Sequence, residues 1–244
     1  MNDSIAIGYE SAAQVGKAQQ LAKQLGLRLD NQAKDRLLVT ADRVVLKING
    51  FSPLYADFSR QTWQKRRDAG KKQGLIRACK PTKGLRIIDA TAGWGRDAAV
   101  LASFGAEVIM LERQPIMAAL LADALMRRDD SSKKSLQLQL HPCNALDFLH
   151  NLAPQDYPDV IYIDPMHPER QKSALVKKDM QVLQKLIDRQ DDSLELLVLA
   201  KARVSKRVVV KWPQGYKPLL PPDFSIEGKT VRFDVYIPVD RGGD

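Results

Sequence analysis

Residues 85–97 read Leu-Arg-Ile-Ile-Asp-Ala-Thr-Ala-Gly-Trp-Gly-Arg-Asp. A short apolar run ends on Asp89, a glycine-rich turn follows, and the apolar residues 98–104 predict the start of a helix. A second apolar run at 108–111 predicts another strand, which ends on the acid Glu112. Glycines let a turn approach a ligand closely, a helix start offers free N–H groups, and an acid after the second strand can bind two ribose hydroxyls. The stretch therefore predicts a nucleoside-binding βαβ unit.

The order of the acid and the glycines bears on which nucleoside ligand is bound. Dinucleotide dehydrogenases prefer Gly-x-Gly-x-x-Gly directly after the strand, whereas here Asp89 comes first and Gly93 and Gly95 come later. S-adenosylmethionine enzymes often have this acid-first order, so this cofactor is favoured over a nicotinamide dinucleotide. Two glycines after a strand are a weak signal on their own, and a tight turn without a ligand is the alternative interpretation.

Length and composition limit the remaining possibilities. A chain of 244 residues with 44% hydrophobic content can form one sizeable core and a small additional domain. The two cysteines, Cys79 and Cys143, and the three scattered histidines lack metal-ligand spacing, so we expect no metal site and no disulfide framework. No apolar run is long enough to span a bilayer, and the N-terminus has no basic region ahead of an apolar one. We expect a soluble cytoplasmic protein.

Positive charge is concentrated in residues 60–80. The chain has a formal net charge of +9, and this segment holds eight cations against the single acid Asp68, a local charge of +7. The cations are Arg60, Lys65, Arg66, Arg67, Lys71, Lys72, Arg77 and Lys80. A solvated basic face is the simpler interpretation, but this density, with Trp63 available for stacking, favours a nucleic-acid backbone as the partner.

The first 80 residues do not belong to the nucleoside-binding unit. Their pattern predicts a small α+β domain, with strands at 5–9, 37–40, 44–48 and 54–58 and a helix that starts at 15 and is stopped by Gly26. The basic segment forms the C-terminal end of this domain, and Pro81-Thr-Lys-Gly84 forms the boundary to the next one. The predicted domains are therefore 1–80 and 81–244.

The second half continues the alternation of strands and helices. Pro115 starts a helix with an apolar face, and the polar residues 127–135 are expected to form a loop. Further strands are expected at 136–140, 160–163, 207–211, 224–227 and 230–237, with a helix at 194–202. In a doubly wound sheet, ligands bind at the carboxyl ends of the strands, which places Cys143 and Asn144 at the rim of the same crevice. Asn144 is a candidate for an adenine contact, and an ordinary surface asparagine is the alternative.

The strand at 160–163 ends in Asp164-Pro165-Met166-His167-Pro168. This resembles the Asp/Asn-Pro-Pro-aromatic motif of methyltransferases that act on the amino groups of nucleic-acid bases. An exocyclic amine is a poor nucleophile because its lone pair is delocalised into the ring. The Asp164 side chain and the Pro165 carbonyl can accept hydrogen bonds from the two N–H groups of the amine. These hydrogen bonds direct the lone pair of the nitrogen at a methyl donor, and proline fixes the backbone that presents the carbonyl. A simple Asp-Pro turn is the alternative.

Several long runs resemble the ribosomal RNA small subunit methyltransferase J family. They are residues 89–97, 110–113, 164–166 with 171–180, 66–67 and 206–213, and the resemblance covers roughly 54–237. It implies a class I, Rossmann-like fold with a mostly parallel seven-stranded sheet. It also implies methylation of the exocyclic N2 of a guanosine in small-subunit ribosomal RNA, with S-adenosylmethionine as cofactor and no metal.

The resemblance also implies roles for individual residues. Asp164 and Pro165 are the catalytic candidates. The cofactor site comprises Asp89, Gly93, Gly95, Arg96, Asp97, Glu112, Arg113, Cys143, Asn144 and Asp164. Substrate contacts are assigned to His167, Arg66, Arg67, Lys71, Lys72, Lys172, Lys177 and Lys178, of which the last three are equally consistent with a solvated helix face.

The chain departs from the family at two places. Cys143-Asn144 replaces a pair of small hydroxyl residues, and His167 replaces an aromatic residue. Other activities remain open: an amino-methyltransferase of DNA or another RNA, a nicotinamide-dependent oxidoreductase, and a non-catalytic RNA-binding protein with a vestigial crevice.

Overall fold

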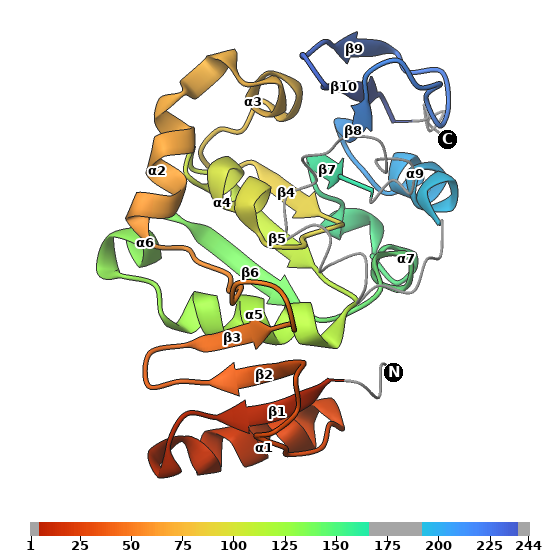
Figure 1. The fold of residues 1–244 in the computed structure, drawn as a ribbon. Coiled ribbons are helices and arrows are strands. Elements are labelled where there is room, and N and C mark those ends of the chain that lie inside the picture. Colours follow the sequence, from red (N-terminus) through yellow and green to blue (C-terminus); the bar gives the residue numbers. More distant parts are fainter. Residues whose placement is uncertain (1–4, 166–191, 239–244) are drawn as a thin grey trace. The chain divides into compact units, whose positions relative to one another are not determined.

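The computed structural model describes residues 5–165 and 192–238 (Figure 1). The described residues form two compact units. The first comprises residues 5–57 and 114–127, and the second comprises residues 58–113, 128–165 and 192–238. These units have different bounds from the predicted domains 1–80 and 81–244, and that division stays a prediction.

The first unit is built on a three-stranded sheet of order β1-β2-β3. Its strands are β1 (Ala6–Tyr9), β2 (Arg36–Val39) and β3 (Val44–Lys47), with β1 and β2 parallel and β2 and β3 antiparallel. Helix α1 (Val15–Leu25) forms the crossover between the parallel pair and ends where Gly26 adopts a φ of 64°. The predicted strand at 54–58 was wrong, because Leu54 makes only an isolated bridge to Leu46. Ala56 and Phe58 are buried without strand pairing, whereas Tyr55 is exposed.

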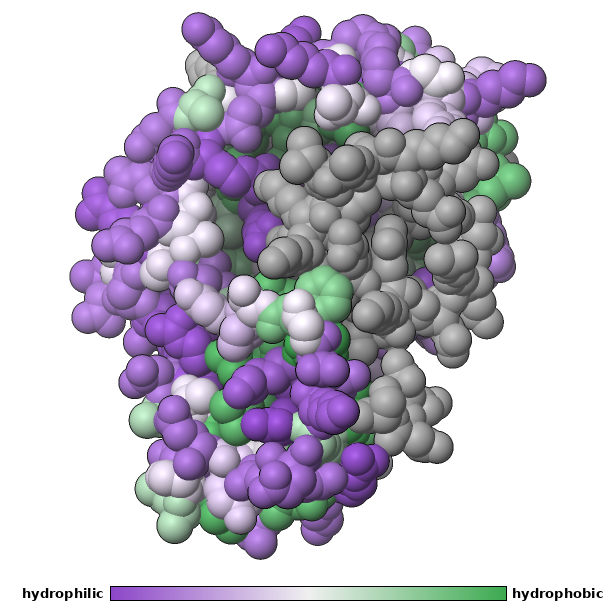
Figure 2. Space-filling view, in the orientation of Figure 1, coloured by the Kyte–Doolittle hydropathy of each residue, from purple (hydrophilic) through white to green (hydrophobic). Residues whose placement is uncertain are grey.

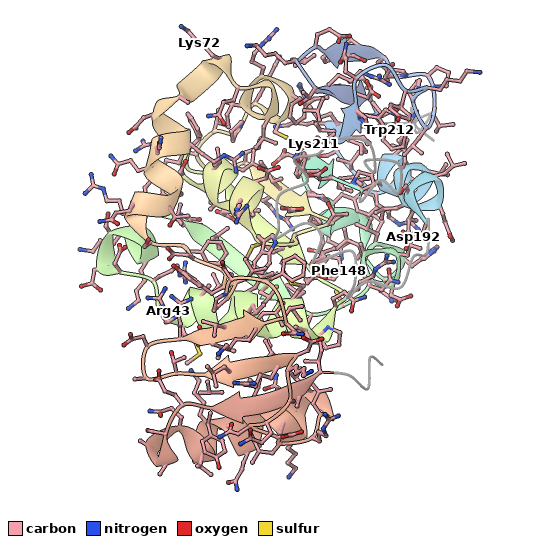
Figure 3. All side chains as sticks on the ribbon, in the orientation of Figure 1. Arg43, Lys72, Phe148, Asp192, Lys211 and Trp212 are labelled. Carbon is pink, nitrogen blue, oxygen red and sulfur yellow. The ribbon has the colours of Figure 1, made fainter. Side chains whose placement is uncertain are left out.

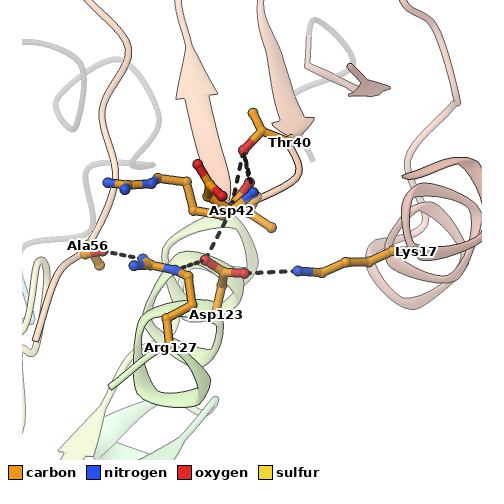
Figure 4. Close-up of polar contacts among 8 residues, drawn as sticks. Lys17, Thr40, Asp42, Ala56, Asp123 and Arg127 are labelled. Atoms are coloured by element: carbon orange, nitrogen blue, oxygen red, sulfur yellow. Dashed lines mark hydrogen bonds and ion pairs between the residues drawn. The ribbon is translucent and has the colours of Figure 1, made fainter. Parts of the chain in front are cut away.

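Helix α5 (Pro115–Met126) is joined to this sheet through the buried side chain of Asp123. Its carboxylate accepts hydrogen bonds from the backbone N–H of Val44 at 3.0 Å, from Lys17 Nζ at 3.0 Å and from Arg127 Nε at 2.7 Å (Figure 4). Burial alone would raise the pKa of Asp123, but these donors lower it below its ordinary value. The buried charge is therefore paired, and it fixes α5 to the edge strand β3.

The second unit contains a seven-stranded sheet of order β6-β5-β4-β7-β8-β10-β9 (Figure 1). The strands are β4 (Arg86–Asp89), β5 (Glu107–Leu111), β6 (Gln137–His141), β7 (Val160–Ile163), β8 (Arg207–Pro213), β9 (Phe224–Ile226) and β10 (Val231–Tyr236). All neighbours are parallel except β10, which is antiparallel to both β8 and β9. The predicted mostly parallel seven-stranded sheet is confirmed.

Helices cover both faces of this sheet. Helices α7 (Ala145–His150) and α9 (Ser193–Ala202) pack on one face, over a core that includes Ile161, Val208 and Val210. Helices α3 (Gly74–Cys79) and α4 (Arg96–Ala102) pack on the other face, and α2 (Arg60–Asp68) contacts α4. Because side chains alternate along a strand, Tyr162 and Lys211 point to the face covered by α4.

We predicted a loop over residues 127–135, and this prediction was wrong for most of the segment. Residues 130–135 form α6 (Asp130–Ser135), and Asp129 caps it by accepting a hydrogen bond from the Ser132 N–H at 2.7 Å. All six of its residues are polar, so the sequence shows no apolar periodicity over this helix. Within the described ranges, no helix is both long and apolar enough to cross a membrane.

Candidate active site

Four acids gather at the carboxyl ends of adjacent strands in the second unit. Asp89 ends β4, Glu112 follows β5 and Asp164 follows β7, while Asp97 lies in the first turn of α4. The carboxylates interact electrostatically, since Asp97, Asp164 and Glu112 all act on Asp89. The sequence predicted this convergence, because the carboxyl ends of parallel strands meet at one edge of a sheet.

The turn between β4 and α4 is shaped by its two glycines and by Glu112. Gly93 and Gly95 have φ values of 53° and 68°, in the left-handed region that favours glycine. The Glu112 side chain is buried, and its Oε2 accepts a hydrogen bond from the Gly93 N–H at 2.9 Å. Among the described residues, the buried indole Nε1 of Trp94 has no hydrogen-bond partner. The turn thus retains an unsatisfied polar group of the kind that a bound ligand or water can pair.

Asp89 is hydrogen-bonded to the backbone of this turn. It is 1% exposed, and its Oδ1 accepts a hydrogen bond from the Thr91 N–H at 3.1 Å. Burial raises the pKa of Asp89 well above its ordinary value, and the neighbouring carboxylates raise it further. The hydroxyl of Thr91 in turn accepts the backbone N–H of Asp164 at 2.7 Å. The glycine-rich turn is therefore hydrogen-bonded directly to the residue after β7, where the catalytic candidates lie.

Lys211 on β8, labelled in Figure 3, lies in the second unit. Its ammonium forms an ion pair with Asp164. Its Nζ lies 2.6 Å from Oδ2 of Asp164 and 3.4 Å from Oδ2 of Asp97. Burial alone would lower the pKa of Lys211, but the two carboxylates raise it above its ordinary value. Lys211 is therefore charged and bridges the two acids.

Asp97 interacts with three side chains of this group: Lys211, Tyr162 and Arg66. Besides Lys211, it accepts a hydrogen bond from the Tyr162 hydroxyl at 2.7 Å and pairs with Arg66 at 2.6 Å. Burial alone would raise the pKa of Asp97, but Lys211, Arg66 and Tyr162 lower it to about 2. Burial raises the pKa of Tyr162 well above its ordinary value, so the hydroxyl keeps its proton and donates a hydrogen bond to Asp97.

The remaining cofactor candidates lie around this group. Arg113 pairs with Asp192 at 2.7 Å, and Arg96 is exposed at the start of α4. Asn144 caps α7, since its Oδ1 accepts the Leu146 N–H at 2.8 Å. The side-chain oxygen of Asn144 is therefore the N-cap acceptor of α7. Burial raises the pKa of Cys143, and the charge of Asp147 adds to this shift.

The basic segment divides between the site and the surface. Arg66 belongs to the acid cluster, whereas Arg67 and Lys72 are exposed, and Figure 2 shows hydrophilic side chains over α2. Lys71 lies in the short turn Gly70–Lys72 that follows α2. The expectation that Trp63 stacks on a base was wrong: it is 3% exposed, and its indole N–H donates to Ser132 Oγ at 3.0 Å. His167, Lys172, Lys177 and Lys178 lie outside the described residues.

Three residues of the site were not predicted as functional from the sequence: Thr91, Tyr162 and Lys211. A signal for Lys211 was present, because Ile163 pairs with Val210 in the parallel ladder, so that the next residues along, Asp164 and Lys211, are neighbours. That signal required the strand order β7-β8 to be known. Thr91 and Tyr162 lay inside the motifs but have no distinctive spacing of their own.

Comparisons with known proteins identify the class. A family model described as "Putative SAM-dependent methyltransferase" matches residues 20–238. A crystal structure of the SAM-dependent methyltransferase NGO1261 from Neisseria gonorrhoeae is 31% identical, with a TM-score of 0.74 over 98% of this chain and 97% of that one. The fold and the crevice thus define a class I methyltransferase that uses S-adenosylmethionine (SAM).

Relatives narrow the class to one family. The chain is 62% identical to the ribosomal RNA small subunit methyltransferase J of Legionella pneumophila (strain Corby) over 98% of both chains. It is 42% identical to the protein of that name in Coxiella burnetii (strain Dugway 5J108-111), over 97% of this chain and 98% of the relative. The chain belongs to the ribosomal RNA small subunit methyltransferase J family. The predicted family, fold class, enzyme class and cofactor are therefore confirmed.

Proposed function

We propose that this chain methylates the exocyclic N2 amine of one guanosine in small-subunit ribosomal RNA, with SAM as methyl donor. The observation that carries the proposal is the position of Asp164-Pro165. This step directly follows β7, is bonded to the glycine-rich turn through Thr91, and lies in a chain whose relatives bear the name of a small-subunit ribosomal RNA methyltransferase.

The crevice residues fit the cofactor. A buried acid at the end of β5, Glu112, is suited to the ribose hydroxyls, and the left-handed turn at Gly93 and Gly95 is suited to close backbone approach. The full proposed set is Asp89, Gly93, Gly95, Arg96, Asp97, Glu112, Arg113, Cys143, Asn144 and Asp164. When bound, SAM supplies an electrophilic methyl group on a cationic sulfonium.

The chain's own part in the reaction is to orient the amine. The Asp164 carboxylate and the Pro165 carbonyl each accept one N–H bond, which favours a pyramidal nitrogen over the planar, conjugated form. The Asp164 carboxylate acts as a hydrogen-bond acceptor in this step, with its Oδ2 paired with Lys211 Nζ at 2.6 Å. The proton leaves the methylated nitrogen for water, since the cationic form of that nitrogen is strongly acidic.

The RNA partner is supported by charge. Arg67 and Lys72 are exposed on and after α2, and the segment 60–80 carries a net charge of +7, which suits a phosphate backbone. Lys71 is assigned to the same backbone, and His167, Lys172, Lys177 and Lys178 to the nucleotides near the pocket. We also place the protein in the cytoplasm, and we assign RNA engagement to the predicted domain 1–80.

The decisive experiment maps methylated guanines in ribosomal RNA from cells with and without this protein. We expect one small-subunit guanine to lose its N2 methyl group in the deletion and to regain it when the gene is restored. Methylation assays of the purified protein on DNA and on other RNAs separate the nearest alternatives. An unchanged ribosomal methylation pattern would refute the proposal.

A further inference from the structure

Lys211 is a largely buried cation that lies between two acids of the site. Its side chain is 25% exposed, and its ammonium contacts Asp164 and Asp97 at 2.6 and 3.4 Å. Burying an ammonium is costly unless it is paired, so its position is determined by these two carboxylates. The ladder between β7 and β8 places it beside Asp164, and the alternation of side chains directs it to the α4 face.

The ammonium of Lys211 lies closer to Asp164 than to Asp97. Asp97 also pairs with Arg66 at 2.6 Å and accepts the Tyr162 hydroxyl at 2.7 Å, so it keeps a cation and a donor if Lys211 is removed. Asp164 forms the shorter contact with Lys211 and lies among the carboxylates of Asp89 and Asp97. The ammonium therefore has its larger effect on Asp164.

We propose that Lys211 is a positioning residue for methyl transfer, and that it holds the Asp164 side chain ionised and in one orientation so that Asp164 accepts the substrate amine. This inference rests on the proposed function. An ammonium at 2.6 Å favours the carboxylate form of Asp164, whereas the neighbouring acids favour its protonated form. A protonated carboxyl presents a donor hydroxyl, and its remaining oxygen accepts more weakly than a carboxylate does.

The main test replaces Lys211 with methionine, which keeps much of the side chain's length and removes its charge. In single-turnover methylation of ribosomal RNA at saturating SAM, Lys211→Met should lower the rate at pH 7 by about tenfold, less than the loss expected for Asp164 itself. The acid limb of its pH–rate profile should move to higher pH. Lys211→Arg should recover most of the rate, and thermal melting checks folding, with Lys211→Gln as the substitute if the methionine variant does not fold.

Lys206 offers a matched control directly before the start of β8. Its Nζ pairs with Asp159 at 2.9 Å, but the side chain is 56% exposed and lies outside the acid cluster. Lys206→Met removes the same charge and one aspartate ion pair, and it should leave both the rate and the pH profile unchanged. A loss in both variants would show that net charge, and not the contact with Asp164, is responsible.

A double-mutant cycle asks whether Lys211 acts through Asp164. Because Asp164→Asn leaves a neutral acceptor that needs no cation, adding Lys211→Met to it should cost much less than it costs the wild type. An equal loss in both backgrounds would overturn the proposal. So would a Lys211→Met variant that binds SAM more weakly but keeps the wild-type saturated rate and pH profile, since Lys211 would then be a cofactor ligand.

A measurement without substrate separates this inference from the proposed function. Carboxyl-carbon NMR can follow the ionisation of Asp164 in the wild type and in Lys211→Met, with Asp164→Asn identifying the signal. We expect the titration midpoint to move to higher pH in the variant. An unchanged midpoint overturns the role of Lys211 even if ribosomal RNA is the substrate, whereas a wild-type chain that methylates no ribosomal guanine refutes only the proposed function.

Discussion

Replacing Glu112 with alanine tests the cofactor site at a buried proposed contact. The side chain is 8% exposed and already accepts the Gly93 N–H at 2.9 Å, so its orientation is fixed before a ligand binds. Hydrogen bonds to a charged group contribute about 1.5–3 kcal/mol. If Glu112 accepts the ribose hydroxyls, its loss should weaken SAM binding by that amount, or about 10- to 150-fold in Kd. Isothermal titration calorimetry measures the change directly.

Two further variants separate binding from folding. Glu107 is exposed at the opposite end of β5, so Glu107→Ala should leave the affinity unchanged. Glu112→Gln keeps a carbonyl oxygen and should give an intermediate affinity. Thermal melting of each variant without SAM reports how much the bond to Gly93 contributes to stability. If Glu112→Ala binds SAM as tightly as the wild type, Glu112 only shapes the turn and the cofactor assignment is refuted.

Three other predictions use different measurements. Asp164→Ala should lower the single-turnover rate at saturating SAM by about a hundredfold or more, whereas Asp164→Asn, which keeps an acceptor, should retain more activity; similar rates for alanine and wild type would contradict the mechanism. Arg67→Gln combined with Lys72→Gln should flatten the slope of log RNA affinity against log salt by about 1.4, from about 0.7 per phosphate contact on a single strand. Fluorescence anisotropy measures that slope, and an unaltered value would assign both side chains to a solvated surface. The pKa of Asp97 is lowered to about 2, below its unfolded value of about 3.9, so its stabilisation is present above pH 4 and lost as the pH falls toward 2. In urea unfolding, Asp97→Asn should lose less stability than the wild type over that range, and an equal loss would contradict the assignment.

The sequence predicted that acids standing at the ends of strands come together. Asp89, Glu112 and Asp164 follow three strands whose apolar runs were clear, and parallel strands bring such positions together without any knowledge of side-chain packing. Glycine 93 and glycine 95 adopt the left-handed backbone that their residue type favours. These features depend on local sequence and on one general rule of sheet topology.

Features that depend on tertiary contacts could not be predicted in this way. Trp63 stands in a run of cations, and only the contact with Ser132 shows that it is a buried residue of α2. The polar helix α6 depends on the Asp129 cap, which apolar periodicity does not detect. Arg66 is indistinguishable from Arg67 by composition, yet one pairs with Asp97 and the other is exposed. Charge density predicted a basic surface but not which cations belong to it.

That division between Arg66 and Arg67 bears on how one unit can bind ligands of opposite charge. SAM carries a sulfonium and an ammonium against one carboxylate, whereas RNA is a polyanion. The cations Arg66 and Lys211 are each paired with a carboxylate, Arg66 with Asp97 and Lys211 with Asp97 and Asp164, although the chain as a whole carries +9. If Lys211 were a simple phosphate contact, the acids beside it would repel the same phosphate. Its pairing with Asp164 is therefore better explained as support for the amine acceptor, and the exposed cations of α2 remain as the attraction for RNA.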